Sequence, residues 1–384
     1  MPPMLPALDS AAAHLTDVLP SCLAALDGLP NTLGLPAANH VVVVLVDGLG
    51  LSSLRARAGH ARHLTAHLTK KSRLASGFPT TTAAALASLT TGVSPGIHGL
   101  VGYTALVPET DTVVNQLTGW GPSMQPQTWQ AVPTLFERAS AAGIGCTAIG
   151  APKYVTSGFT QAVLRGATYL GGKTIADRFA AARALLDRTP AGQRTLTYLY
   201  IPELDMASHA HGWQSDQFTA ALETVDAEMA AFSAALGSGE GMLLTADHGM
   251  IDVPQTSHVL FDSVPELVAG IRHVAGDPRC LQLHFEPELP AAERAAVVEA
   301  WRAVEGERAW VLTRDEAIEA GWFGEVLPSI RPRIGDLIVA ARKNIAYYDS
   351  RRTPASKRTM IGQHGSWSDD ELFVPLLRFG AFGA

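Results

Sequence analysis

Apolar positions fall into two patterns that alternate along the chain. Short continuous apolar runs, which are typical of strands buried on both faces, occur at 41–46, 145–149, 197–201, 242–245, 336–340 and 373–377. Longer Ala-rich runs of helical character lie at 83–89, 175–186, 215–236 and 290–304. In 215–236 the apolar residues recur at helical spacing and form one stripe. The alternation predicts an α/β fold, a three-layer αβα sandwich around a largely parallel sheet.

The stretch from 256 to 330 differs from the rest of the chain. It is richer in Glu and Arg, contains its own predicted helix, and alternates apolar and polar residues at 281–285. We interpret 256–330 as a small inserted cap subdomain. The main core is then discontinuous and consists of residues 1–255 and 331–384.

Composition excludes several classes of protein. Of the 384 residues, 47% are hydrophobic and 17% charged, which is too apolar for a disordered chain. The formal net charge of −7 gives no basic patch for nucleic acid. The three cysteines are too far apart for a disulfide framework. No apolar run is long enough to span a membrane and no signal peptide is visible, so we expect a cytoplasmic protein. The oligomeric state stays open.

Acidic residues follow three of the predicted strands. Asp47, Asp205 and Asp247 come directly or shortly after the runs at 41–46, 197–201 and 242–245. Ligands of open α/β sheets bind at the carboxyl ends of the strands. Three carboxylates at this edge would repel one another unless a cation lies between them. The repeated order of strand and acid therefore predicts a cation site.

Histidines accompany these carboxylates. His209 lies four residues after Asp205, so one helical turn places both on one face. His248 directly follows Asp247, and His364 stands in a Gly-Gln-His-Gly run near the C-terminus. Carboxylate and imidazole ligands together suit zinc, manganese or iron better than calcium. Any one of these histidines alone is more often structural, so the prediction depends on the whole set.

A threonine run offers a candidate nucleophile. The residues 80–82 precede the predicted helix at 83–89, where free N–H groups and the helix dipole favour an anion. The alternative is a helix-capping threonine. A cation that lowers the pKa of its bound oxygen could activate a threonine without a neighbouring base.

Together these residues resemble the alkaline phosphatase superfamily, and most of all its type I phosphodiesterase / nucleotide pyrophosphatase branch. Five blocks carry the resemblance, in the family's order: 41–50, 78–103, 198–212, 243–250 and 362–377. The resemblance implies an alkaline-phosphatase-like catalytic core. It also implies a hydrolase that cleaves phosphate esters through a covalent phospho-threonine intermediate.

The resemblance further implies two divalent metal ions, most often Zn²⁺, with Mn²⁺ or Fe as alternatives. Carried over by motif, Asp47, Thr82, Asp247 and His248 would hold the first metal, and Asp205, His209 and His364 the second. The family pattern selects Thr82 as the nucleophile because it stands ten residues before the Gly of the Thr91-Gly92 pair.

The substrate pocket departs from the family pattern. Tyr103 occupies the place of a family Asn that contacts a phosphoryl oxygen. Tyr200, Lys153 and Tyr154 are further candidate substrate-binding residues. The expected substrate is a small phosphate ester, with a nucleotide as one candidate. A phosphomonoesterase on the same scaffold is the alternative function, and a non-catalytic metal-binding module is a remote one.

Overall fold

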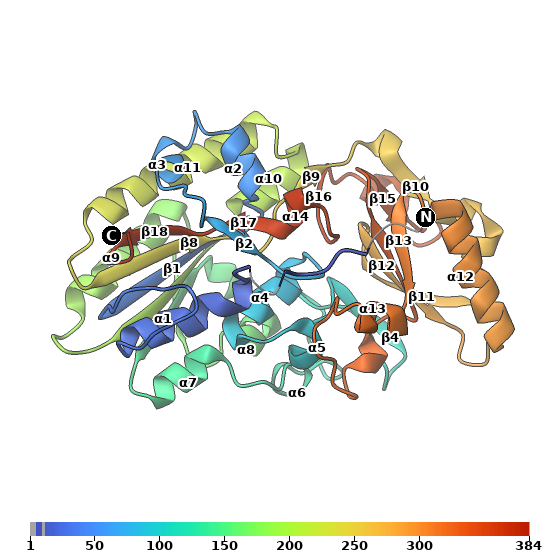
Figure 1. The fold of residues 1–384 in the computed structure, drawn as a ribbon, viewed down its shortest axis with the longest axis horizontal. Helices are drawn as coiled ribbons and strands as arrows, with labels where there is room; N and C mark the ends of the chain where they lie inside the picture. The colour runs from blue at the N-terminus through green and yellow to red at the C-terminus, as the bar shows by residue number, and fades with distance from the viewer. Residues whose placement is uncertain (1–4, 10–11, 384) are drawn as a thin grey trace.

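The computed structural model describes residues 5–9 and 12–383, and it contains two six-stranded sheets side by side along its long axis (Figure 1). The first sheet has the order β18-β8-β1-β7-β5-β6. Its strands are β1 (His40–Val46), β5 (Gly145–Gly150), β6 (Thr168–Gly171), β7 (Thr195–Ile201), β8 (Glu240–Thr245) and β18 (Leu377–Gly380). The five strands from β8 to β6 are parallel, and β18 pairs antiparallel with β8.

Helices cover both faces of this first sheet (Figure 1). One face carries α1 (Val18–Leu26), α4 (Thr82–Thr91), α7 (Leu135–Ala141) and α8 (Gly158–Val163), and the other carries α2 (Leu51–Ala56), α3 (Arg62–Ala66), α9 (Ile175–Arg188), α10 (Glu203–His211) and α11 (Asp216–Ala234). The central strand β1 is buried from Val41 to Val46 because it lies between both helical layers. The predicted α/β sandwich with a largely parallel sheet is confirmed.

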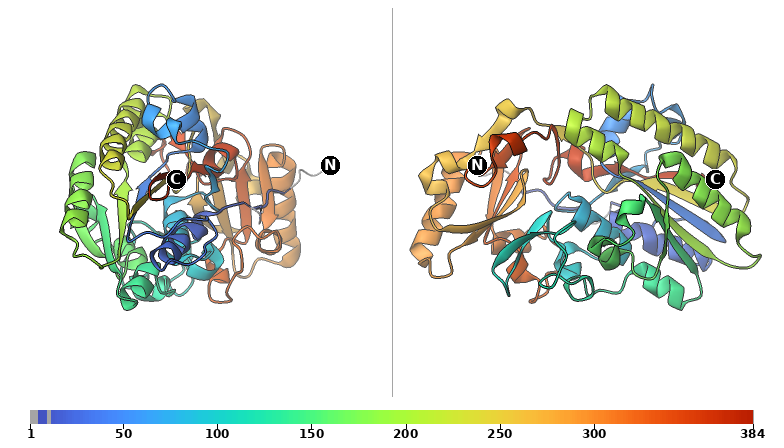
Figure 2. Two further views of the ribbon diagram at one scale, coloured as in Figure 1. Left: turned by 60° about the vertical axis from the view of Figure 1, so that its left-hand side comes forward. Right: turned by 180° about the vertical axis from the view of Figure 1, so that it is seen from behind.

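The second sheet is antiparallel, with the order β13-β14-β12-β11-β3-β4. Its strands are β3 (Thr104–Val107), β4 (Thr112–Asn115), β11 (Ile271–Asp277), β12 (Cys280–Phe285), β13 (Ala309–Thr313) and β14 (Leu337–Ala341). Helix α12 (Ala291–Glu305) packs on its outer side, as both views of Figure 2 show. We call this sheet and α12 the second lobe.

One strand prediction was wrong in its placement. The apolar run at 336–340 forms β14, which belongs to the antiparallel second sheet and not to the parallel one. Its Leu337 and Val339 pack in one core cluster and its Ile338 in another. An apolar run of this kind shows that both faces of a strand are buried, but not in which sheet the strand lies.

The boundaries of the predicted cap, 256 and 330, stay a prediction. The second sheet also takes β3, β4 and β14 from outside this range. The run at 373–377 forms parts of two strands, β17 (Phe373–Pro375), which pairs with β2 (Arg73–Ala75), and β18. The chain therefore crosses between the two sheets several times.

Shorter elements connect these layers. They are α5 (Pro95–His98), α6 (Pro126–Trp129), α13 (Arg314–Glu319), α14 (Asp369–Leu372), β9 (Ile251–Asp252), β10 (His258–Leu260), β15 (Ala346–Tyr348) and β16 (Gly362–Gln363). Within the described ranges, no helix combines the length and apolarity needed to cross a membrane.

Candidate active site

Three carboxylates meet at the carboxyl edge of the first sheet. Strand β1 lies between β7 and β8, so the segments that follow these three strands are neighbours. Asp47 follows β1 directly, Asp247 follows β8 after one residue, and Asp205 lies in the first turn of α10 after β7. The structure thus brings together the three acids that the strand pattern placed at one edge.

Tight turns hold these carboxylates in place. Gly48 has φ +75°, and a Cβ at this position would lie 3.0 Å from the Cα of Asp205. The Gly48 N–H donates to Asp247 Oδ1 at 3.2 Å, and the His248 N–H donates to the same oxygen at 3.0 Å. A larger residue at position 48 would therefore push the strand ends apart.

Each carboxylate leaves one buried oxygen without a hydrogen-bond partner among the described residues. These oxygens are Asp47 Oδ1, Asp205 Oδ1 and Asp247 Oδ2. Burial raises the pKa of Asp205 and of Asp247 to about 6. Burial and the charges of the two neighbouring acids also raise the pKa of Asp47 well above its usual value. Buried, unsatisfied and mutually repelling carboxylates are the donor set that a cation stabilises.

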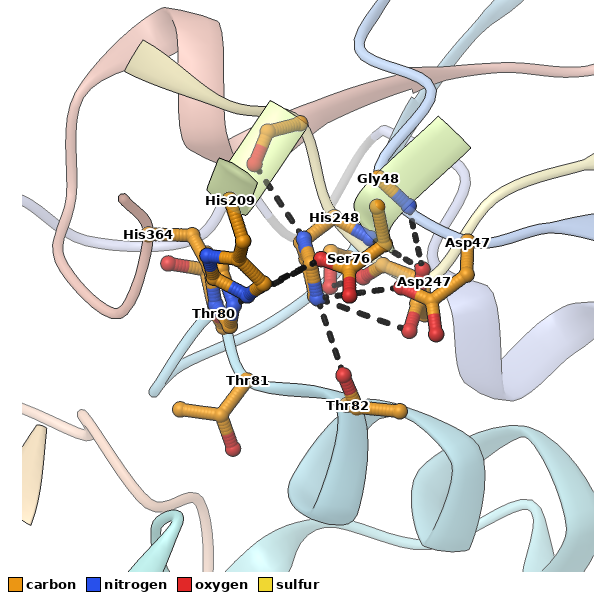
Figure 3. A network of polar contacts seen from close by, with 12 residues as sticks. Asp47, Gly48, Ser76, Thr80, Thr81, Thr82, His209, Asp247, His248 and His364 are labelled. Atoms are coloured by element: carbon orange, nitrogen blue, oxygen red, sulfur yellow. Dashed lines mark hydrogen bonds and ion pairs between the residues drawn. The ribbon is translucent and has the colours of Figure 1, made fainter. Parts of the chain in front are cut away.

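The rings of His209, His248 and His364 lie close together beside these carboxylates (Figure 3). A backbone carbonyl lies within hydrogen-bond distance of each Nδ1, namely Gly362 O for His209 (2.8 Å), Gly249 O for His248 (3.2 Å) and Thr80 O for His364 (2.8 Å). Because a carbonyl oxygen only accepts, Nδ1 carries the proton in each ring. Burial lowers the pKa of His248 and of His364, so in these two rings the opposite atom, Nε2, is an unprotonated ligand atom.

These Nε2 atoms lie opposite the carboxylate oxygens. His248 Nε2 is 3.4 Å from Asp47 Oδ1 and 3.5 Å from Asp247 Oδ2. Asp205 Oδ1 is 3.2 Å from His209 Nε2 and 3.9 Å from His364 Nε2. Burial lowers the pKa of His248 to about 3, so its Nε2 carries no proton that could bridge to the Asp47 and Asp247 oxygens. The donor set therefore fits divalent cations.

The ligand atoms form two compact groups. One consists of Asp205, His209 and His364, and the other of Asp47, Asp205 and His248, with the atoms of each group within 4.8 Å of one another. The first group is the set that the sequence assigned to the second metal. In the second group Asp205 joins Asp47 and His248, whereas Asp247, which the resemblance assigns to this metal, is outside the group although its Oδ2 lies 3.5 Å from His248 Nε2.

Thr82 is the threonine whose hydroxyl faces this cluster. It begins α4, and its Oγ1 lies 3.1 Å from His248 Nε2 (Figure 3). Thr80 Oγ1 donates to Ser366 O, and Thr81 Oγ1 accepts the Ala84 N–H as the N-cap of α4. The hydroxyls of Thr80 and Thr81 thus form hydrogen bonds to the backbone that stabilise the fold, whereas the hydroxyl of Thr82 faces the cluster.

Two cavities, of about 490 and 610 Å³, share Thr82 and Asp205 in their walls. Lys153, Tyr154 and Tyr200 line the larger cavity, together with other aromatic side chains. Tyr103 lines the smaller one. The four candidate substrate-binding residues therefore lie in the walls of two different cavities, both of which reach Thr82.

Tyr200 also contacts the acidic cluster, because its hydroxyl donates a hydrogen bond to Asp47 Oδ2. Burial, followed by the charge of Asp47, raises the pKa of Tyr200 well above its usual value, so the phenol keeps its proton. Tyr200 therefore orients one of the candidate ligands.

The chain was compared with protein-family models and with known proteins. The model of the type I phosphodiesterase / nucleotide pyrophosphatase family matches residues 41–367. The chain belongs to this family. A search of curated protein sequences found no match. Membership in the family supports a hydrolase of phosphodiester or pyrophosphate bonds.

Solved structures share the fold of this family member at low sequence identity. Murine ectonucleotide pyrophosphatase / phosphodiesterase 5, as an inactive variant in complex with AMP, is 15% identical with a TM-score of 0.66, over 89% of this chain and 88% of that one. Phosphonoacetate hydrolase from Sinorhizobium meliloti 1021, in complex with phosphonoacetate, is 18% identical with a TM-score of 0.69, over 90% and 91%. At these identities the likeness establishes the fold.

Sequence reasoning missed part of the site in this phosphodiesterase-family chain. The smaller cavity is also lined by Asp277 from β11, and by Arg352 and Lys357 from the loop after β15. None of them lies in a block that carries the family resemblance. Only the packing of distant segments of the chain brings these residues to the cavity that Thr82 lines, and no local pattern in the sequence signals it.

Proposed function

We propose that the chain hydrolyses phosphate esters of the phosphodiester or pyrophosphate type, with Thr82 as the nucleophile and two divalent cations as cofactors. One observation carries the proposal. Three buried carboxylate oxygens without hydrogen-bond partners among the described residues lie close to the Nε2 atoms of three histidines, and the Thr82 hydroxyl lies 3.1 Å from the Nε2 of one of them, His248.

The ligands divide between two cations. Asp205, His209 and His364 would hold one cation, and Asp47, Asp247, His248 and Thr82 would hold the other. Zn²⁺ suits this mixture of imidazole and carboxylate ligands, as Mn²⁺ and Fe do. Such cations would lower the pKa of the Thr82 hydroxyl and offset charge on the phosphoryl group. Three carboxylates and one alkoxide balance the charge of two dications.

The reaction would proceed in two displacements at phosphorus. In the first, Thr82 Oγ1 releases its proton to solvent and forms a bond to phosphorus, while the bond from phosphorus to the leaving oxygen breaks. The leaving oxygen takes up a proton from water. In the second, a water molecule attacks the phospho-threonine, the bond from phosphorus to Oγ1 breaks, and Thr82 regains its proton. The position of Thr82 at the start of α4 places the helix N-terminus beside the anionic intermediate.

The cavities on two sides of Thr82 favour a substrate with two substituents on phosphorus. A phosphodiester or pyrophosphate has a group for each cavity, whereas a monoester fills one. The ligands of two structural neighbours are smaller: one neighbour is an inactive threonine-to-alanine variant in complex with AMP, a nucleotide monoester, and the other is a phosphonoacetate hydrolase in complex with phosphonoacetate. A nucleotide is therefore the first substrate to examine.

The proposal is tested with Thr82→Ala and with Thr90→Ala as a matched control on the same helix. The Thr90 hydroxyl donates to Leu86 O and lies outside both cavities. With zinc present, we expect Thr82→Ala to lose turnover of bis(p-nitrophenyl) phosphate by a factor on the order of 10⁴ or more. Its metal content should stay at the wild-type value, and Thr90→Ala should remain active.

The outcomes separate the alternatives. Unchanged turnover in Thr82→Ala would reject Thr82 as the nucleophile. Faster cleavage of p-nitrophenyl phosphate than of the diester by the wild-type chain would move the function to a phosphomonoesterase. A wild-type chain that binds zinc and cleaves neither ester would favour a non-catalytic metal-binding module.

A further inference from the structure

The second lobe contributes one buried carboxyl to the site. Asp277 is the last residue of β11, at the hairpin that leads into β12, and its side chain lines the smaller cavity together with Thr82 and His364. The residue is only 7% exposed. The reaction outlined above gives this residue no part.

Two contacts fix the hairpin against the C-terminal segment that contains His364 and Glu371. Arg279 forms a fully buried bidentate ion pair with Glu371, with distances of 2.9 Å and 2.6 Å. Gly365, the residue after His364, has φ +129°, and a Cβ there would lie 3.0 Å from the Cβ of Asp277. Asp277 therefore packs against the backbone that carries a candidate metal ligand, and it has little room to move.

The hydrogen bonds of Asp277 leave one oxygen free. Its Oδ2 accepts the Tyr103 N–H at 3.3 Å, and among the described residues Oδ1 has no hydrogen-bond partner and the carboxyl no ion pair. Arg279, two residues further along the hairpin, is already paired with Glu371, whose own charge disfavours ionisation of Asp277. Burial raises the pKa of Asp277 to about 8, so the carboxyl keeps its proton at neutral pH.

Other charged groups face the same cavity. Asp205, His209 and His364 belong to the cation cluster, and Tyr103, Tyr347, Tyr348, Asp349, Arg352 and Lys357 complete the titratable groups of the wall. Asp349 is paired with Arg351 and Arg352. With the charges of the proposed cations balanced by their ligands, an incoming phosphate anion would favour the protonated form of Asp277 further.

A protonated carboxyl in this position is a hydrogen-bond donor, and a substrate phosphate presents anionic acceptors. We propose that Asp277 donates a hydrogen bond from its neutral carboxyl to an anionic oxygen of the bound phosphate ester. This inference rests on the proposed function. Tyr103, the residue that the sequence predicts for a contact with the phosphoryl group, lines the same cavity, and its backbone N–H donates to Asp277.

The test compares two replacements that differ in one property. Asp277→Asn has the same shape and always carries a donor, whereas Asp277→Ala carries none. At pH 7 we expect Asp277→Asn to stay within about threefold of wild-type kcat/KM, and Asp277→Ala to lose about 10- to 100-fold, as for a lost hydrogen bond to a charged group. Binding of inorganic phosphate is measured by calorimetry on the zinc-loaded protein. Its Kd should rise in Asp277→Ala and stay unchanged in Asp277→Asn.

A pH profile adds a readout that packing alone would not change. Above pH 8 the wild-type chain should lose affinity for inorganic phosphate as Asp277 ionises, and Asp277→Asn should lose less. Asp315→Asn, which changes an exposed acid of α13, is the control and should behave as wild type. Thermal unfolding checks the fold of each variant, and Asp277→Leu serves as a second variant without a donor if Asp277→Ala unfolds.

Two results would overturn the inference. Equal losses in Asp277→Asn and Asp277→Ala would show that the anion, and not the neutral donor, is required. Wild-type phosphate affinity in Asp277→Ala would show that the contact does not exist. A wild-type chain without ester hydrolysis would reject the proposed function instead, so the two failures are distinguishable.

Discussion

Acid is expected to weaken cation binding in a definite pH range, because the carboxyls that bind a cation must first lose their protons. Asp205 and Asp247 have pKa values raised to about 6, whereas the pKa of His248 is lowered to about 3. The raised pKa means that these carboxyls destabilise the metal-free fold as the pH rises through 6. Above pH 6 a cation relieves this cost without competition. Below pH 6 protons compete with it at both carboxyls, while His248 stays unprotonated.

The magnitude follows from linkage. At pH 5, one unit below this pKa, protonation of one carboxyl per cation raises each apparent Kd for zinc about tenfold. This change corresponds to about 1.4 kcal/mol of binding free energy. Zinc at about 100 times its Kd stabilises the fold by about 2.7 kcal/mol per site, and at about ten times its Kd by about 1.4 kcal/mol. With about 2.1 cal/mol/K of unfolding entropy per residue, the 384 residues give about 0.8 kcal/mol/K. Two sites then raise Tm by about 7 °C at pH 7 and by about 3.5 °C at pH 5.

The assay is thermal unfolding with zinc and with a chelator at both pH values. At each pH, the Tm with chelator is subtracted from the Tm with zinc, and the two differences are compared. This subtraction is needed because buried neutral histidines such as His98, whose pKa is lowered to about 3, destabilise the fold in acid whether or not zinc is present. At pH 7 the variant Asp205→Asn should lose at least about half of the zinc-induced rise in Tm. The control Asp216→Asn, at an exposed position, should keep the full rise. An equal rise at pH 5 and pH 7, or a full rise in Asp205→Asn, would refute the reasoning.

Two further predictions concern the groups that support the site. Tyr200→Phe removes the hydrogen bond to Asp47 Oδ2, so zinc affinity should fall about 10- to 100-fold in calorimetry with the fold intact; unchanged affinity would contradict this role. Arg279→Met leaves Glu371 buried without its partner and should cost about 3–5 kcal/mol in chemical denaturation. Arg331→Gln, which breaks an exposed pair, should cost about 1 kcal/mol or less, and equal losses would contradict the effect of burial.

The sequence predicted the parts of the site that depend on local order. Asp47 follows its strand directly and Asp247 follows its strand after one residue, and parallel neighbouring strands necessarily end at one edge. The helix that starts at Thr82 is visible in its composition and its preceding proline. Such features need only the identity and direction of the strands, so the order of residues along the chain is enough to predict that they meet in space.

The remaining parts depend on contacts between the two lobes. The run at 336–340 was placed in the wrong sheet because apolar strands of both sheets are buried on both faces. Gln282 and His284 alternate with apolar residues in β12 as a half-exposed strand would, yet both are buried. In the sequence, Asp277 has the features of an ordinary turn residue. Only the packing of its hairpin against the loop at Gly365 places it in the cavity wall. Packing between distant segments gives these residues their environment.

The central claim is that two cations lie between the clustered aspartates and histidines beside Thr82. X-ray diffraction at the zinc absorption edge, on crystals of the wild-type chain grown with zinc, tests it directly. Two anomalous peaks about 3.5–4 Å apart are expected, one among Asp205, His209 and His364 and the other beside Asp47 and His248. No peak at this edge of the sheet, in crystals that diffract well and contain ample zinc, would contradict the claim.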